Sequence, residues 1–133
     1  MNLEPNNKSL SFAEFLDSIT TESTTYDFTY DAFGNTTSVE AGNSTLASYT
    51  YNANNGKLNI LTYGNGLKVK YLYDILDRIE KIQYNIGEND QFVTVYSYTY
   101  DSAGNIFSVT DHVNDEVTMY KYDMLGRLVK SYV

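Results

Sequence analysis

Polar and aromatic residues alternate in short stretches from residue 26 to the end of the chain. In Tyr98-Thr99-Tyr100, for example, two aromatic residues flank a polar one. Successive side chains of a β-strand point to opposite faces, so this spacing places both rings on one face of an extended strand. The alternation therefore predicts strands that each carry an aromatic face.

A tight turn is predicted directly after each aromatic pair. In the last copy of the pattern, Asp123 opens the turn and Gly126 closes it. Aspartate is suited to accept backbone N–H groups at the start of a type I turn, and glycine adopts the left-handed conformation without steric cost. Since a type I turn followed by a left-handed residue closes a bulged hairpin, each copy predicts one β-hairpin.

Five copies of this unit follow one another. The second aromatic residue stands at positions 30, 51, 73, 100 and 122, in steps of 21, 22, 27 and 22 residues. Such regularity predicts an array of repeated structural units, in which the motif residues serve the fold. The motif residues are Tyr30, Asp31, Gly34, Tyr49, Tyr51, Gly56, Tyr71, Tyr73, Asp74, Tyr98, Tyr100, Asp101, Gly104, Tyr120, Tyr122, Asp123, Gly126 and Arg127.

Turn signals between the copies join the hairpins into an all-β antiparallel meander of about ten strands in a curved sheet. Gly42-Asn43, Gly64-Asn65-Gly66, Gly87 and Asn114-Asp115 separate the β-prone runs. Ile79 and Ile82 are three residues apart, which breaks the alternation and predicts a β-bulge just after that turn. The expected strands span about 26–30, 36–40, 46–51, 57–63, 67–73, 78–84, 92–100, 106–111, 116–122 and 127–132.

The first 25 residues lack the repeat pattern. Ser11 and Glu14 have the spacing of a capping box, and apolar residues from Phe12 to Ile19 fall on one face of a helix. The sequence thus predicts a short amphipathic helix near 12–19 and a linker over 20–25. The expected division is an N-terminal extension, 1–25, followed by the hairpin segment, 26–133.

The composition narrows the classes of partner. A net charge of −8 disfavours binding to phosphate backbones, so no nucleic-acid partner is expected. No apolar run is long enough to span a bilayer, and no secretory signal is predicted at the start of the sequence. Without cysteine the chain has neither disulfides nor thiolate metal ligands, so the cellular compartment stays open.

Catalytic chemistry finds little support in the sequence. His112 is the single histidine and lies beside Asp111 near an expected turn, and no second histidine, cysteine or suitable serine arrangement completes a nucleophile–base pair. The repeated aspartates invite a calcium site, but each stands where the turn itself needs aspartate. The prediction is therefore no catalytic, metal or cofactor-binding residue and no enzyme activity.

The motif Tyr-x-Tyr-Asp-x-x-Gly-Arg-Leu, complete at Tyr120 to Leu128, resembles the YD repeat of the Rhs family. This family includes bacterial polymorphic toxins, wall-associated proteins, the C component of insecticidal toxin complexes and animal teneurins. The resemblance covers about 26–133. It implies a long β-strip that spirals into a hollow shell, which in the bacterial toxins encloses a variable toxin domain.

Several positions depart from this repeat. Asp77 stands where the repeat usually has glycine, and Asn52 stands in place of the turn-opening aspartate. Asn35, Lys57 and Asn105 replace the usual arginine. The motif that closes the shell in toxin members and a downstream toxin domain are both missing, so the sequence is expected to form at most an arc of a shell.

The resemblance implies a structural role, as scaffold or shell wall in a larger secreted or cell-surface bacterial protein. Its partners would be neighbouring repeats, and self-association through an exposed strand edge is expected. A second hypothesis stays open, because nine of the 14 tyrosines occupy the aromatic-x-aromatic positions. Such a face could bind a carbohydrate or a cell surface by stacking rings on sugars, or it could pack within the protein.

Overall fold

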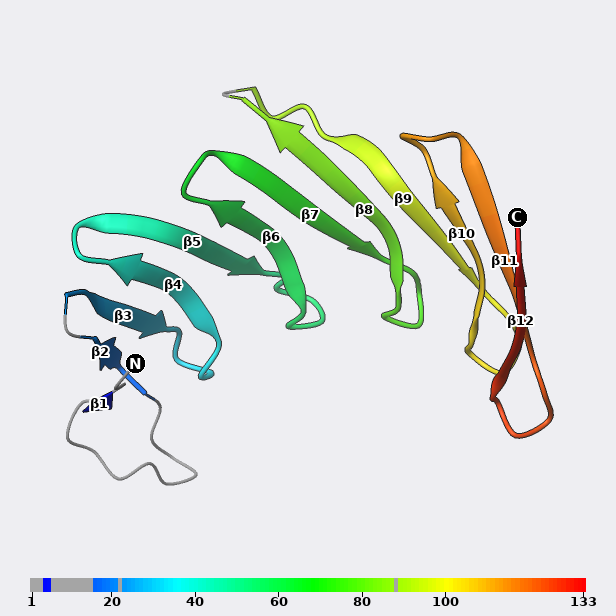
Figure 1. The fold of residues 1–133 in the computed structure, drawn as a ribbon, viewed down its shortest axis with the longest axis horizontal. Helices are drawn as coiled ribbons and strands as arrows, with labels where there is room; N and C mark the ends of the chain where they lie inside the picture. The colour runs from blue at the N-terminus through cyan, green and yellow to red at the C-terminus, as the bar shows by residue number, and fades with distance from the viewer. Residues whose placement is uncertain (1–3, 6–15, 22, 88) are drawn as a thin grey trace. The chain divides into compact units, whose positions relative to one another are not determined.

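The computed structural model describes residues 4–5, 16–21, 23–87 and 89–133 (Figure 1). All regular elements among these residues are strands. The chain divides into two compact units, Met1–Lys68 and Val69–Val133. Within each unit the strands lie side by side in the order in which they follow along the chain.

The first unit is a meander whose strands pair antiparallel with their sequence neighbours. Each pairing from β1 to β6 is antiparallel. These strands are β1 (Glu4–Pro5), β2 (Ser18–Thr20), β3 (Thr25–Tyr30), β4 (Thr36–Ala41), β5 (Ser44–Tyr51) and β6 (Leu58–Tyr63), followed by the start of β7 (Leu67–Tyr73).

The second unit repeats this plan. After the rest of β7, antiparallel pairing runs without interruption from β8 to β12. Here the strands are β8 (Ile79–Ile86), β9 (Val93–Tyr100), β10 (Ile106–Asp111), β11 (Glu116–Tyr122) and β12 (Leu128–Tyr132). The predicted all-β antiparallel meander is confirmed, and each of the ten expected strands is present within two residues of its expected ends.

The predicted N-terminal helix is not supported. Residues 12–15 lie outside the described residues, but Ser18 and Ile19 belong to β2 and pair with β3. The edge of β3 offers backbone groups that a strand can satisfy, and Ile19 lies opposite Tyr26. Within the expected linker, Thr20 ends β2 and Thr25 begins β3, and the Thr21 N–H donates to the Thr24 carbonyl at 2.8 Å. The boundary at residue 25 stays a prediction.

A bulge recurs at the same place in four hairpins. In the first, Tyr30 pairs with Thr36 and Thr29 with Ser38, which leaves one extra residue on the returning strand. The extra residues of the four hairpins are Thr37, Asn59, Phe107 and Val129. The bulge predicted from Ile79 and Ile82 would be the fifth member of this series.

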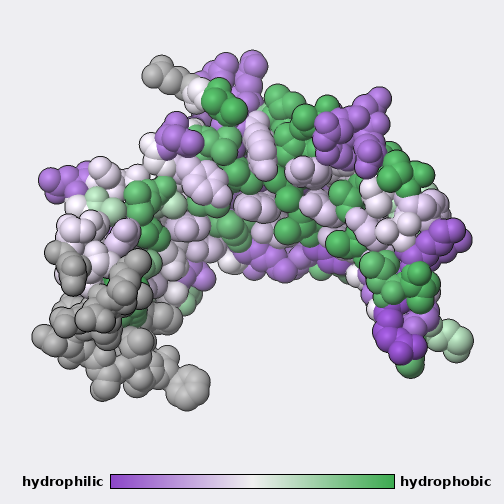
Figure 2. All heavy atoms as spheres, viewed as in Figure 1, coloured by the Kyte–Doolittle hydropathy of each residue, from purple (hydrophilic) through white to green (hydrophobic). Residues whose placement is uncertain are grey.

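The sheet buries few side chains completely. Among the described residues the buried apolar ones are Ala47, Val69 and Val95. Most rings of the aromatic positions are half-buried, and apolar residues remain on the visible surface of both units (Figure 2). Contacts between neighbouring strands must therefore supply most of the stability of each unit.

Candidate functional site

The turns of the hairpins are built by the motif aspartates. In one of them, Asp101 Oδ1 accepts the backbone N–H groups of Ala103 and Asn105 at 3.0 and 2.9 Å. The Gly104 N–H donates to the Asp101 carbonyl at 3.0 Å, with glycine at φ +87°. The same pattern recurs in the turns opened by Asp31, Asp74 and Asp123. Hydrogen bonds from the residue four positions later, through its side chain and its backbone N–H, are the main cause that lowers the pKa of each aspartate.

The residue after the glycine position donates a side-chain hydrogen bond to the second carboxylate oxygen of the motif aspartate. Arg78 Nε donates to Asp74 Oδ2 at 2.8 Å, and Arg127 Nε donates to Asp123 Oδ2 at 2.7 Å. Where asparagine replaces arginine, its side-chain amide makes the corresponding bond, at 3.0 Å from Asn35 and 3.3 Å from Asn105. Arginine thus adds a charge to a contact that asparagine makes as a neutral group.

Two turns differ from the motif in sequence but keep its left-handed residue and its hydrogen bonds. Asp77 takes the left-handed conformation of the missing glycine, with φ +59°, and donates its N–H to the Asp74 carbonyl at 3.0 Å. The turn at Asn52 is one residue longer, yet Asn52 Oδ1 accepts the Asn54 N–H at 2.8 Å and Gly56 has φ +69°. Aspartate and asparagine are among the residues that tolerate these roles best.

The second tyrosine of a repeat joins its hairpin to the preceding one. Tyr100 Oη donates to the Ile79 carbonyl at 2.5 Å, and Tyr122 Oη donates to the Ile106 carbonyl at 2.8 Å. Tyr51 makes the same contact with Thr36 at 2.6 Å. In each case the acceptor is the first residue of the strand that returns from the preceding turn. We call this contact the tyrosine joint.

The first tyrosine makes a similar bond at the start of the repeats, although its acceptor lies two residues before β2. Tyr30 Oη donates to the Leu16 carbonyl at 2.5 Å. Sequence reasoning missed these bonds, although a signal was present. The second aromatic position is tyrosine in all five copies, whereas the first position accepts Phe28. A requirement for the hydroxyl explains this difference.

One joint also carries a stacked cation. The Arg78 guanidinium lies 4.2 Å from the centroid of the Tyr100 ring while it pairs with Asp74. Burial and the Asp74 charge raise the pKa of Tyr100, and Arg78 opposes this shift. At the Tyr51 joint of the first unit, burial, the Asp31 charge and the neighbouring Tyr49 raise the pKa of Tyr51. The two joints therefore differ in electrostatics although their backbone contacts match.

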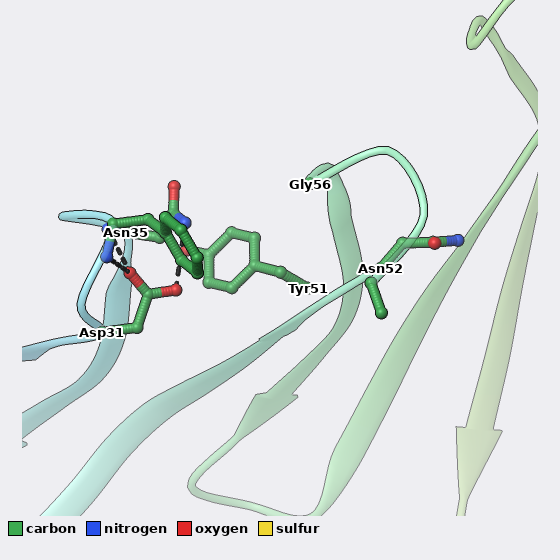
Figure 3. A pocket seen from close by; sticks show the side chains of 7 residues that line it. Asp31, Asn35, Tyr51, Asn52 and Gly56 are labelled. Carbon is green, nitrogen blue, oxygen red and sulfur yellow. Dashed lines mark hydrogen bonds between the residues drawn. The ribbon is translucent and has the colours of Figure 1, made fainter.

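A cavity of about 450 Å³ lies at this joint of the first unit (Figure 3). The Tyr51 ring extends from β5 toward the Asp31–Asn35 pair, and the turn from Asn52 to Gly56 borders the other side. Phe33, at the tip of the first turn, also lines the cavity. Its side chain is 91% exposed.

The opposite ends of the hairpins include a close backbone approach. The Gly64 N–H donates to the Leu46 carbonyl at 2.8 Å, and a Cβ on Gly64 would lie 2.4 Å from the Thr45 carbonyl oxygen. Asn65 Oδ1 accepts the Leu67 N–H at 3.0 Å, and Gly66 has φ +89°. Each residue of the Gly-Asn-Gly segment therefore meets a separate structural requirement of this turn.

His112 has a partner that the sequence did not reveal. Its Nε2 lies 2.8 Å from Ser97 Oγ, on an exposed part of the sheet. The neighbouring Asp111 carboxylate accepts the N–H groups of Val113 and Asn114, so it serves the turn. The described residues contain no group of three or more carboxylate, histidine or cysteine side chains placed to hold a metal ion. The motif aspartates therefore do not gather into such a group.

No helix among the described residues is long and apolar enough to cross a membrane. The repeated turns and tyrosine joints define the class of protein, which is a repeat protein built from antiparallel β-hairpins. The model of the family described as Teneurin YD-shell matches residues 10–133, so the chain belongs to this family. No protein of curated function matches the sequence.

Solved structures of the Tc toxins share this fold. The chain is similar to the Photorhabdus luminescens Tc holotoxin pore, with a TM-score of 0.74 and 20% identity over 92% of this chain and 6% of that one. It is also similar to TcdB2-TccC3, with a TM-score of 0.73 and 20% identity over 90% of this chain and 7% of that one. The chain thus spans a small fraction of the length of the structures it matches.

Proposed function

We propose that this chain is a structural wall segment of a larger Rhs/YD-type shell and has no catalytic activity of its own. The observation that carries the proposal is the tyrosine joint. At Tyr51, Tyr100 and Tyr122 the motif tyrosine holds its hairpin against the preceding one. Tyr30 makes a similar bond to the segment before the first repeat. A motif whose polar groups bond to the backbone of its own sheet serves architecture.

The family and the fold support this role. The matching family is described by its YD-shell, and the similar structures belong to toxin assemblies far longer than this chain. By this proposal the motif residues are structural, the partners are neighbouring hairpins, and the complete protein acts outside the cell that makes it. Pairing between copies through the β12 edge stays a prediction, which light scattering can test.

Carbohydrate binding is the competing proposal and remains untested. The tyrosine joints favour packing, because a hydroxyl that donates to a backbone carbonyl holds the ring against its own sheet. A glycan array probed with the chain and with a Tyr98→Ala, Tyr100→Ala double variant that stays folded distinguishes the two. A signal that the double variant loses would favour the carbohydrate hypothesis, and a flat response would remove it.

The wall proposal is tested by lengthening the sheet. Leu128 begins β12 as Ile79 begins β8, so Val133 corresponds to Tyr84. A fusion that repeats residues 85–133 directly after Val133 therefore continues the array in register. The tyrosine copied from Tyr100 would then donate to the Leu128 carbonyl. A matched control fusion replaces only this copied tyrosine with leucine.

A wall segment should accept the added hairpins as part of its own sheet. We expect the fusion to unfold with a higher denaturant midpoint and a larger m-value than the chain, because each hairpin adds an interface with its neighbour. The control fusion should lose most of the gain in midpoint. Added hairpins that unfold separately, or leave the midpoint unchanged, would contradict the proposal.

A further inference from the structure

The cavity at the joint of the first two motif turns has the features of a binding site for a planar cation. Asp31, Phe33 and Tyr51 are among the residues that line it. Its volume of about 450 Å³ falls within the range of ordinary small-ligand pockets. We propose that this cavity binds the guanidinium group of an arginine side chain supplied by another polypeptide segment.

The second unit shows what the corresponding space holds when the arginine of the repeat is present. There the Arg78 guanidinium lies 4.2 Å from the Tyr100 ring centroid and 2.7 Å from Asp74 Oδ2. The correspondence rests on the tyrosine joints. Tyr100 donates to the carbonyl that follows Arg78, and Tyr51 donates to the carbonyl that follows Asn35. Asn35 therefore occupies the position of Arg78, and Asp31 that of Asp74.

Because asparagine is shorter than arginine and neutral, this turn brings no guanidinium to the Asp31 carboxylate and the Tyr51 ring. Asn35 Nδ2 reaches Asp31 Oδ2 at 3.0 Å, so it meets the carboxylate with a neutral amide. The cavity lies between this pair and the Tyr51 ring, where the guanidinium lies in the other unit. Burial, and after it the Asp31 charge, raises the pKa of Tyr51.

The chemistry of the walls favours arginine over lysine. A guanidinium is planar, stacks on aromatic faces and directs N–H groups toward a carboxylate in its own plane. Phe33 supplies a second aromatic wall, and at 91% exposure it has much apolar surface left to cover. The hairpin opened by Asp101 has Ala103 at the position of Phe33, so it lacks this wall.

The binding can be measured on the whole chain with an isolated arginine. The probes are N-acetyl-arginine amide and N-acetyl-lysine amide, and the readout is the change in backbone NMR shifts on titration. We expect saturable shifts around Phe33, Asn35 and Tyr51 with the arginine probe and much weaker ones with lysine. Phe33→Ala should weaken binding by about 2- to 5-fold, since it removes one stacking face. Phe33 is exposed, so this variant should fold.

Two further variants locate the site. Asn35→Arg should abolish binding of the probe, because its own side chain would fill the cavity. Asn105→Arg places the same residue at the same turn position in the other unit and should leave binding unchanged. The inference is overturned if no saturable binding occurs, if Asn35→Arg still binds, or if Asn105→Arg abolishes binding. Equal shifts with both probes would also overturn it, since they indicate attraction to charge alone.

Discussion

The backbone contact at Gly64 leads to a prediction whose size can be worked from the structure. An added Cβ would lie 2.4 Å from the Thr45 carbonyl oxygen, about 0.6 Å short of the 3.0 Å that real Cβ contacts require. The obstacle is backbone, so it cannot rotate away as a side chain would. If the strand end moves by this amount, the bond from the Gly64 N–H to the Leu46 carbonyl, now 2.8 Å, stretches beyond the usual range.

The expected cost combines two effects. Overpacking against rigid surroundings costs about 1–3 kcal/mol, and losing a backbone hydrogen bond costs about 0.5–1.5 kcal/mol. We therefore expect Gly64→Asn to lower the free energy of unfolding by about 2–4 kcal/mol. Gly66→Asn is the matched control. Its Cβ would have nothing within 4 Å, and asparagine tolerates the positive φ of +89° better than most residues, so its cost should stay below about 1.5 kcal/mol.

Urea unfolding followed by far-ultraviolet circular dichroism compares the two variants directly. The same substituent is introduced two residues apart in one turn, so its effects on the unfolded chain largely cancel. The reasoning would be refuted if Gly64→Asn were no more destabilising than Gly66→Asn. Such a result would mean that the end of β6 does not approach β5 as closely as the structure has it.

Three other predictions test the turns and the joints. Tyr122→Phe removes the hydroxyl that donates to the Ile106 carbonyl, so it should lower the free energy of unfolding in urea by about 0.5–1.5 kcal/mol. The control Tyr120→Phe should be nearly neutral, and equal effects of the two variants would contradict the role of the joint. Gly104→Val should cost about 1–3 kcal/mol in the same assay, because φ is +87° in otherwise open space, and a neutral result would reject the turn assignment. The lowered pKa values of the motif aspartates contribute stability that is fully present above the usual value of 3.8 and is lost as pH falls through the folded pKa values. The unfolding midpoint should therefore decrease as pH is lowered below about 5, and a flat profile down to pH 2 would count against the carboxylate caps.

Local chemistry explains why the hairpins could be predicted from the sequence. The strand positions follow from alternation, and the turns follow from aspartate and glycine acting within four or five residues of each other, as in Asp101 to Asn105. The turn at Asp77 adds a further lesson. Asp77 replaces the glycine of the repeat there, yet aspartate adopts the left-handed conformation and the turn keeps its bonds.

Contacts between distant residues could not be predicted in the same way. Ile19 has helical spacing to its neighbours, but Ser18–Thr20 pair with β3 because that edge satisfies their backbone groups. The tyrosine joint links Tyr100 to a carbonyl 21 residues earlier, and the Ser97–His112 pair spans 15 residues. These contacts join residues 15 to 21 positions apart, so they depend on how the strands pair and not on the residues of one turn.

The cavity at the Tyr51 joint shows how a substitution gains meaning from the fold. In the sequence, Asn35 is only a departure from the arginine of the repeat. In the structure, the same position lies beside the Tyr51 ring and the Asp31 carboxylate, where Arg78 fills the corresponding space of the other unit. Knowing which tyrosine faces which turn was the missing step.

A density map of the complete protein in which this chain occurs is the most direct test of the architectural role. We predict that residues 25–133 form a stretch of continuous sheet in a wall, with the free edge of β12 hydrogen-bonded to a further hairpin. The second tyrosine of each repeat should bond to the hairpin before it. A map in which these residues form a separate domain, with the tyrosine-bearing face holding a sugar or another ligand, would contradict the account.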